Sequence, residues 1–175
     1  MLNSTKYNEL KRKYKDEKVF VLPANLINAK DKFTKLTHTN KIWTKYDGLG
    51  QYIFRYEAEY NKAFQQIIPY LLICNEDQSK FFVSERIQGD SRLKGMLSMG
   101  FGGHINSIDG FSNIVFNGLV REMNEELNII PISPFQFIGT IRDLSSKTAE
   151  HFGLVFIVKA DPEHISVKET NKLKG

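Results

Sequence analysis

Three glutamates near the middle of the chain are the residues best suited to chemistry. Glu122, Glu125 and Glu126 follow one another at positions i, i+3 and i+4. In a helix with a step of about 100° per residue, these three carboxylates share one face. Like charges this close repel each other, and a hard divalent cation such as Mg²⁺ or Mn²⁺ would relieve the repulsion. The alternative interpretation is a solvated charged surface.

The helix that would carry these acids also has an apolar stripe. The stripe is spaced at i, i+3, i+4, i+7 and i+11 and consists of Phe116, Leu119, Val120, Met123 and Leu127. It is centred roughly 120° from the acidic face, so one face should be buried while the other presents the acids. Arg121, four residues before Glu125, would offset part of the repulsion.

A pair of glycines precedes the predicted helix. Gly102 and Gly103 lack side chains, so the backbone there can approach a ligand and direct a carbonyl or N–H group at it. His104 follows directly. It has two interpretations, a hydrogen bond to a substrate or a hydrogen bond within the loop backbone.

Together these residues resemble the Nudix box. That pattern reads Gly, five residues, Glu, seven residues, then Arg-Glu-aliphatic-any-Glu-Glu-any-Gly-aliphatic. Its second half is matched by Arg121, Glu122, Met123, Glu125, Glu126 and Ile129. Asn128 stands at the last family glycine, and asparagine is the next-best residue for a left-handed helix C-cap.

The first half of the box departs further from the family pattern. Counting back from Arg121 puts Asn113 at the family Glu and Ser107 at the family Gly. The Gly102-Gly103 pair looks like the true loop glycine, with about four extra residues before the helix. Asp109 is the candidate for the missing acid.

The resemblance implies a fold and an activity. The fold would be α/β (α+β), with a mixed β-sheet sandwiched between helices. The activity would be metal-dependent cleavage of a diphosphate linkage in a small nucleoside diphosphate derivative, with Mg²⁺ or Mn²⁺ as cofactor. Glu122, Glu125, Glu126 and the carbonyl of Gly103 would hold the metal, and Arg121 would orient the acids. Relatives often form homodimers.

Other residues outside the box are candidates by the same resemblance. Many relatives use a further acid as base or metal ligand, and Glu150 is our candidate, although a loop glutamate is usually solvated. Arg86 and Arg92 could clamp phosphates, for which arginine is well shaped, or could be solvated.

Two other functions remain open. The first is a Nudix-like module that binds or regulates without catalysis, slightly favoured by Asn113 and the extended loop. The second is a prenyl-diphosphate isomerase of related fold. That enzyme would require a nucleophilic cysteine, but Cys74 falls in an apolar stretch.

Composition limits the remaining possibilities. The chain of 175 residues suits one domain, and we expect residues 1–45 to form an N-terminal helix and lead-in that pack as one unit with a Nudix domain of residues 46–175. The net charge of +4 fits a small phosphorylated ligand and makes nucleic acid an unnecessary partner. A single cysteine and the lack of an apolar leader or membrane-length run predict a cytoplasmic protein.

The pattern of apolar residues predicts where the main elements lie. A surface helix is expected over 4–18, and a turn at 46–50 should lead into an alternating segment over 51–60. Strands are expected over 19–22, 67–74, 80–86, 96–101, 135–141 and 152–159. Pro69 should lie at the start of its strand or at a bulge.

Overall fold

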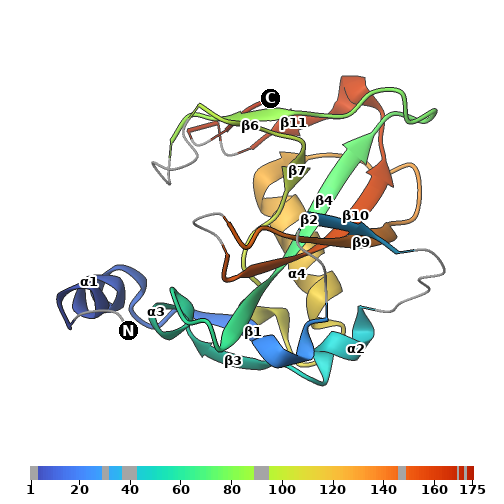
Figure 1. The fold of residues 1–175 in the computed structure, drawn as a ribbon. Coiled ribbons are helices and arrows are strands. Elements are labelled where there is room, and N and C mark those ends of the chain that lie inside the picture. The colour runs from blue at the N-terminus through green and yellow to red at the C-terminus, as the bar shows by residue number, and fades with distance from the viewer. Residues whose placement is uncertain are drawn as a thin grey trace.

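The fold is described from a computed structural model, shown in Figure 1. The residues that it describes are 4–28, 32–36, 43–88, 95–145, 149–168, 170–171 and 173–175. Arg92, one of the predicted phosphate-binding residues, lies outside them.

A seven-stranded mixed sheet forms the centre of the protein. Its order is β2-β9-β10-β4-β1-β3, and β7 also pairs with β4. The strands are β1 (Lys18–Pro23), β2 (Lys32–Lys35), β3 (Gln51–Phe54), β4 (Phe64–Cys74), β7 (Gly100–Phe101), β9 (Gln136–Arg142) and β10 (His151–Lys159). The pair β4 and β10 is parallel and the other pairs are antiparallel, so the predicted mixed sheet is confirmed.

The central strand β4 changes neighbour along its length. Its first residues pair with β1, and Leu71 and Leu72 pair with β7. Pro69 lies between these two segments, not at the start of the strand or at a bulge as predicted. Because no β1 or β7 partner is paired there, the missing N–H of proline costs no hydrogen bond on that side of the strand.

Helix α4 (Ile114–Glu126) packs its apolar side on the sheet and lies behind β4 and β10 in Figure 1. Leu119, Met123 and Leu127 are buried as predicted. Phe116 and Val120 are only partly buried, because Ile114 and Val115 enter the core in their place. The buried stripe is therefore rotated relative to the prediction.

Other expected elements differ in extent. The helix predicted over 4–18 ends earlier, as α1 (Ser4–Tyr14), and the alternating segment after β3 turns into a short helix, α3 (Arg55–Ala58). The strand predicted over 96–101 is broken into β6 (Leu97–Ser98) and β7. Asn128 is not a helix cap: Leu127 ends α4 in an extended conformation, and both residues form β8 (Leu127–Asn128).

The remaining described elements surround the main sheet. They are α2 (Thr44–Asp47), the 3-10 helices η1 (Ala24–Leu26), η2 (Ser107–Asp109) and η3 (Pro162–His164), and the strands β5 (Ser84–Arg86), β11 (Ser166–Val167) and β12 (Leu173–Lys174). The order β12-β5-β6 forms a second sheet, and β8 pairs with β11. Among the described helices, none combines the length and apolar character needed to cross a membrane.

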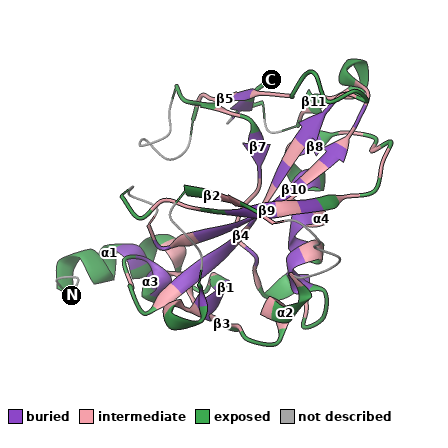
Figure 2. Ribbon diagram, turned by 45° about the vertical axis from the view of Figure 1, so that its right-hand side comes forward, coloured by how far each residue is buried: buried purple, intermediate pink, exposed green. Residues whose placement is uncertain are grey.

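Buried and half-buried residues alternate along the middle of β4 (Figure 2), so the two faces of the main sheet differ in burial. One face carries Ile67, Leu71 and Ile73, which are fully buried in the core that includes α4. On the other face Ile68 and Tyr70 are only half-buried. The short helix α3 covers part of that second face, where Ala58 packs against Val19 and Val21.

Candidate active site

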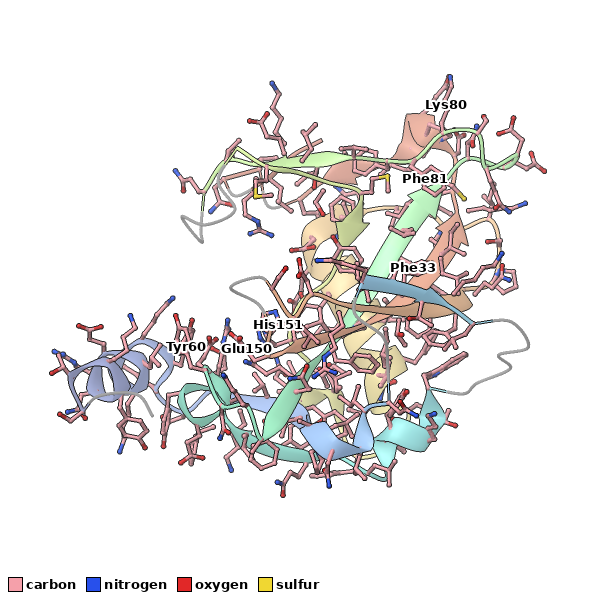
Figure 3. All side chains as sticks on the ribbon, in the orientation of Figure 1. Phe33, Tyr60, Lys80, Phe81, Glu150 and His151 are labelled. Atoms are coloured by element: carbon pink, nitrogen blue, oxygen red, sulfur yellow. The ribbon has the colours of Figure 1, made fainter. Side chains whose placement is uncertain are left out.

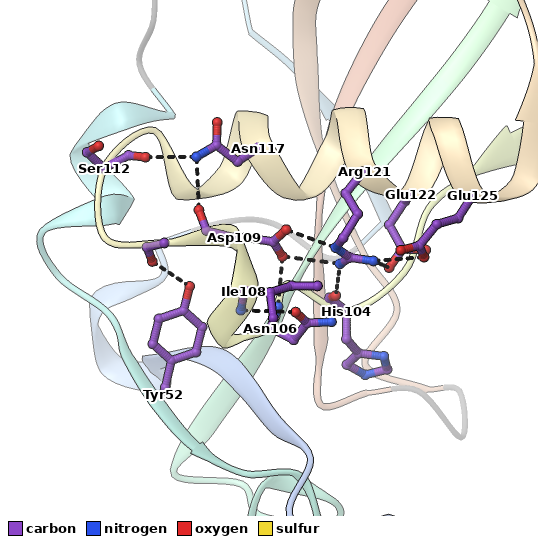
Figure 4. A network of polar contacts seen from close by, with 11 residues as sticks. Tyr52, His104, Asn106, Ile108, Asp109, Ser112, Asn117, Arg121, Glu122 and Glu125 are labelled. Carbon is purple, nitrogen blue, oxygen red and sulfur yellow. Dashed lines mark hydrogen bonds and ion pairs between the residues drawn. The ribbon is translucent and has the colours of Figure 1, made fainter.

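The guanidinium of Arg121 is the centre of a dense polar network, drawn in Figure 4. Its Nε and Nη2 donate to the two carboxylate oxygens of Asp109, at 2.8 and 3.1 Å. Nη2 also donates to the carbonyl of His104 at 2.8 Å. Nη1 donates to Glu122 at 2.8 Å and to Glu125 at 3.0 Å. Arg121 therefore ties the glycine loop to the acidic face of α4.

Asp109 is the acid that anchors this network. Its side chain is 2% exposed, and it also accepts a hydrogen bond from the backbone N–H of Asn106 at 2.9 Å, within a capping box of η2. Burial alone would lower the pKa of Arg121, but the hydrogen bonds that Arg121 donates to Asp109 and the charge of Glu122 outweigh it and raise the pKa. The guanidinium thus stays charged in its partly buried place.

Gly103 and Asp109 have the spacing of the glycine and the acid in the first half of the box. Asp109 follows Gly103 at the family spacing of five intervening residues, so the extra residues lie between Asp109 and Arg121. Asn113, which strict counting placed at the acidic position, precedes α4 in a left-handed conformation with no side-chain cap hydrogen bond. The Gly-x5-Asp spacing, counted forward from Gly103, supports Asp109 as the candidate acid.

The carboxylate of Glu122 lies directly against Gly103. A Cβ atom built on Gly103 would be 2.5 Å from Oε2 and 2.6 Å from Oε1 of Glu122. Any larger residue at this position would therefore displace the carboxylate. Glu122 is 14% exposed, and burial raises its pKa against the lowering effect of Arg121, with Glu125 and Asp109 raising it further. A nearby divalent cation would favour the ionised carboxylate.

The donor chemistry of this site fits a hard divalent cation. Carboxylate and carbonyl oxygens, which Glu122, Glu125, Glu126 and Gly103 offer, are the ligands that Mg²⁺ and Mn²⁺ prefer. In the described part of the chain, no three His, Cys, Asp or Glu side chains already surround one point. Glu125 is 54% exposed, and its i, i+4 ion pair with Arg121 is of a kind worth only about 0.5 kcal/mol. Rotation of this side chain toward a cation is therefore inexpensive.

Two histidines connect the glycine loop to the start of β10. The rings of His104 and His151 are 5.2 Å apart and meet edge to face. Burial, together with the charges of Arg55 and His151, lowers the pKa of His104 well below its usual value, so the ring is neutral near pH 7. Its Nε2 is buried and has no hydrogen-bond partner among the described residues.

The structure places the predicted residues outside the box in different surroundings. Glu150 is 8% exposed, so it is not a solvated loop residue, and it precedes His151 at the start of β10 (Figure 3). Its carbonyl accepts the backbone N–H of Gln66 at 2.7 Å. Arg86 is half-buried in β5, which belongs to the second sheet.

Cys74 is unsuited to nucleophilic chemistry. It is 2% exposed at the end of β4, and its thiol donates to the carbonyl of Val158 at 3.7 Å. Burial raises the pKa of this thiol, which keeps it protonated. The structure therefore gives no support to the isomerase alternative, which needs a reactive cysteine.

The chain is similar to known proteins in both sequence and structure. No family model matches the sequence. Protein YmaB of Bacillus subtilis is 30% identical over 175 aligned positions, which cover 91% of this chain and 84% of YmaB. A solved structure described as "Crystal structure of Tm1382, a putative Nudix hydrolase" matches with a TM-score of 0.74 and 25% identity, over 90% of this chain and 83% of that one.

The residues of the box and the similarity to known proteins indicate the same family. Arg121, Glu122, Glu125 and Glu126 match the second half of the Nudix box, and Gly103 and Asp109 supply its first half around a longer connection to the helix. Both similarities extend over nearly the whole chain. The chain therefore belongs to the Nudix hydrolase family.

Proposed function

We propose that this protein hydrolyses a diphosphate linkage in a nucleoside diphosphate derivative, with Mg²⁺ or Mn²⁺ as cofactor. The observation that carries the proposal is the contact between the Glu122 carboxylate and Gly103, held in place by Arg121. Because Gly103 has no side chain, a ligand bound by the Glu122 carboxylate can also approach the backbone of the glycine loop.

Four residues would hold the cation: Glu122, Glu125 and Glu126 through their carboxylates, and Gly103 through its carbonyl. A bound divalent cation supplies charge neutralisation for the phosphates and lowers the pKa of water. Arg121 keeps the acids oriented and the glycine loop in register with α4. In the reaction, a water oxygen attacks one phosphorus, the bridging P–O bond breaks, and the second phosphate leaves.

Residues outside the box would complete the reaction. Glu150 is the candidate base that accepts the proton of the attacking water, since its position before His151 puts it at the strand end nearest the glycine loop. His104, Arg86 and Arg92 would contact the substrate, His104 as a neutral hydrogen-bonding group and the two arginines as phosphate ligands. These roles rest on the family resemblance and on the placement of the described residues.

The setting of the activity is part of the proposal. We take residues 1–45 and 46–175 to act as one unit, which is supported by the pairing of β1 with β4 in one sheet. A single buried cysteine suits the reducing cytoplasm. A homodimer is proposed on the family resemblance alone.

A substrate screen tests the proposed activity. Nucleotide sugars, dinucleoside polyphosphates, ADP-ribose and nucleoside triphosphates would be supplied with Mg²⁺ or Mn²⁺, and phosphate would be measured after phosphatase coupling. Glu122→Gln and Glu125→Gln should each lower turnover by orders of magnitude, while Glu163→Gln, at an exposed position on η3, should leave it unchanged. Full activity in both box variants would show that these acids do not carry the chemistry.

A binding module without catalysis is the second candidate. It is favoured slightly by the departures in the first half of the box, namely Asn113 at the acidic position by strict counting and the longer connection between the glycine loop and the helix. Calorimetry that detects nucleotide binding while no phosphate is released from any compound in the screen would support this function over hydrolysis.

A further inference from the structure

The sheet face turned away from α4 carries a row of residues that crosses four strands. The register partners in this row are Phe33 on β2, Ile141 on β9, Gly153 on β10 and Ile68 on β4. Directly opposed residues of neighbouring strands lie on the same face, and so do residues two apart along one strand. His151, two residues before Gly153, is therefore on this face, and its ring contacts His104 of the glycine loop.

Phe33 is the large aromatic side chain at the outer end of this row (Figure 3). It is 49% exposed. A Cβ atom built on Gly139 would lie 3.0 and 3.1 Å from two atoms of the Phe33 ring. The ring therefore rests on the backbone of Gly139 in β9, and glycine is what lets it lie there. A ring supported from below and open above is a stacking surface of fixed position.

The position of this ring suits a ligand that extends to the proposed catalytic centre. From β9 the sheet order runs through β10 to β4. Two interstrand spacings amount to about 10 Å. The glycine loop meets β4 there, because a Cβ on Gly102 would be 2.0 Å from the carbonyl oxygen of Pro69. A sugar with its phosphates fills a span of this size.

The charges beside Phe33 favour an anionic ligand and oppose a second copy of this chain. Lys35, two residues after Phe33, is exposed on the same face, whereas the ammonium group of Lys32 on the same short strand is paired with Asp143 at 2.7 Å. β2 is the edge of the sheet. Lysines on an edge strand hinder pairing with another strand, but they attract phosphate.

We propose that Phe33 is the platform on which the aromatic base of a nucleotide stacks, with the phosphates directed along the sheet toward Gly103. This inference rests on the proposed function and names the part of the substrate that the exposed face recognises. The base is bound through its π-face, and the exposed Lys35 adds a long-range attraction for the anionic ligand as a whole. Because stacking is tolerant of base identity, we expect AMP, GMP, CMP and UMP to share this site.

The test measures binding by calorimetry on the full chain, with these four nucleotides and with ribose 5-phosphate as a probe that lacks a base. Phe33→Ala should weaken binding of the nucleotides by about 10- to 100-fold, the range expected for loss of one stacked base. Phe33→Trp should retain it, and ribose 5-phosphate should bind wild type and Phe33→Ala equally. Phe81→Ala is the matched control, since Phe81 is 40% exposed and lies outside this row.

Several results would overturn the platform. They are equal nucleotide affinity in wild type and Phe33→Ala, equal loss for ribose 5-phosphate, or no nucleotide binding by the wild type at all. A change of sedimentation coefficient in Phe33→Ala without a change in affinity would assign the face to contact between copies. Phe33→Leu keeps the apolar volume without the π-face, so it serves if the alanine variant does not fold, and it should also bind nucleotides more weakly.

This experiment separates the platform from the proposed hydrolysis. Hydrolysis that needs Glu122, together with nucleotide binding that ignores Phe33, would remove the platform alone. Binding that depends on Phe33 without any phosphate release would remove hydrolysis and leave a binding protein.

Discussion

Replacement of Gly103 by alanine tests the contact on which the proposed site is built. The new Cβ would be 2.5 Å from the carboxylate carbon of Glu122, whereas ordinary contacts of this kind are 3.4 Å or longer. The carboxylate must therefore move by about 1 Å, and a displacement of that size at a catalytic group can cost about 100-fold in rate.

The same substitution should have little effect on stability. Gly103 is not among the described glycines with positive φ, so alanine fits its backbone. The crowded atoms belong to the end of a flexible side chain, which can turn aside. Loss of freedom in the unfolded chain stabilises such a variant by about 0.4–1 kcal/mol, which offsets part of the strain.

The assay is kcat on whichever substrate the screen identifies, together with Mn²⁺ affinity by calorimetry and the free energy of unfolding in urea. We expect kcat to fall about 100-fold, Mn²⁺ to bind more weakly, and unfolding to change little. Gly48→Ala is the control, because a Cβ there meets nothing within 4 Å. Wild-type kcat and Mn²⁺ affinity in Gly103→Ala would show that the Glu122–Gly103 contact has no role in function.

Three further predictions concern the support of the site. Asp109→Ala removes the buried acid that accepts two hydrogen bonds from Arg121. The free energy of unfolding, measured in urea, should therefore fall by about 3 kcal/mol. A loss below about 1 kcal/mol would mean that the ion pair contributes little to stability. Gly118→Ala places a Cβ 3.0 Å from Ile105 and 3.3 Å from Asp109. The gain in stability of about 1 kcal/mol that alanine normally gives over glycine inside a helix should therefore be absent. A full gain, measured by thermal unfolding, would contradict this crowding. Burial raises the pKa of Cys74, so its thiolate forms only at higher pH. The native protein should therefore react slowly with maleimide at neutral pH and rapidly in urea. Equal rates in the two conditions would contradict the burial of this thiol.

The sequence was most informative where a pattern has one physical meaning. The apolar runs that became β4 and β10 are mostly buried, as expected for central strands, and both strands were predicted within a few residues. The spacing of Leu119, Met123 and Leu127 likewise located α4. Glu122, Glu125 and Glu126 indicated the site because the repulsion between neighbouring carboxylates is relieved mainly by a nearby positive charge.

Other features depend on long-range contacts that a local pattern does not encode. Pro69 was expected at a strand end, but β4 changes neighbours at that residue and tolerates it. Asn128 was expected to cap α4, but pairing between β8 and β11 draws it into a strand. Phe116 belonged to the apolar stripe by spacing, yet its ring packs edge to face on Phe135 at 5.5 Å, beside the core proper.

In the candidate site too, some features follow from the sequence alone and others depend on the fold. The roles of Arg121 and Glu122 follow from residue type and spacing, whereas the pairing of Asp109 with Arg121 required the loop geometry. The proximity of His104 to His151, which lie 47 positions apart in sequence, follows only from the parallel placement of β10 beside β4.

Anomalous scattering from a crystal grown with MnCl₂ tests the central claim most directly. We expect a manganese peak about 2.1 Å from a carboxylate oxygen of Glu122 and from the carbonyl oxygen of Gly103, with Glu125 turned away from Arg121. A map with no peak between α4 and the glycine loop, and with Glu122 and Glu125 still bonded to Arg121, would contradict it.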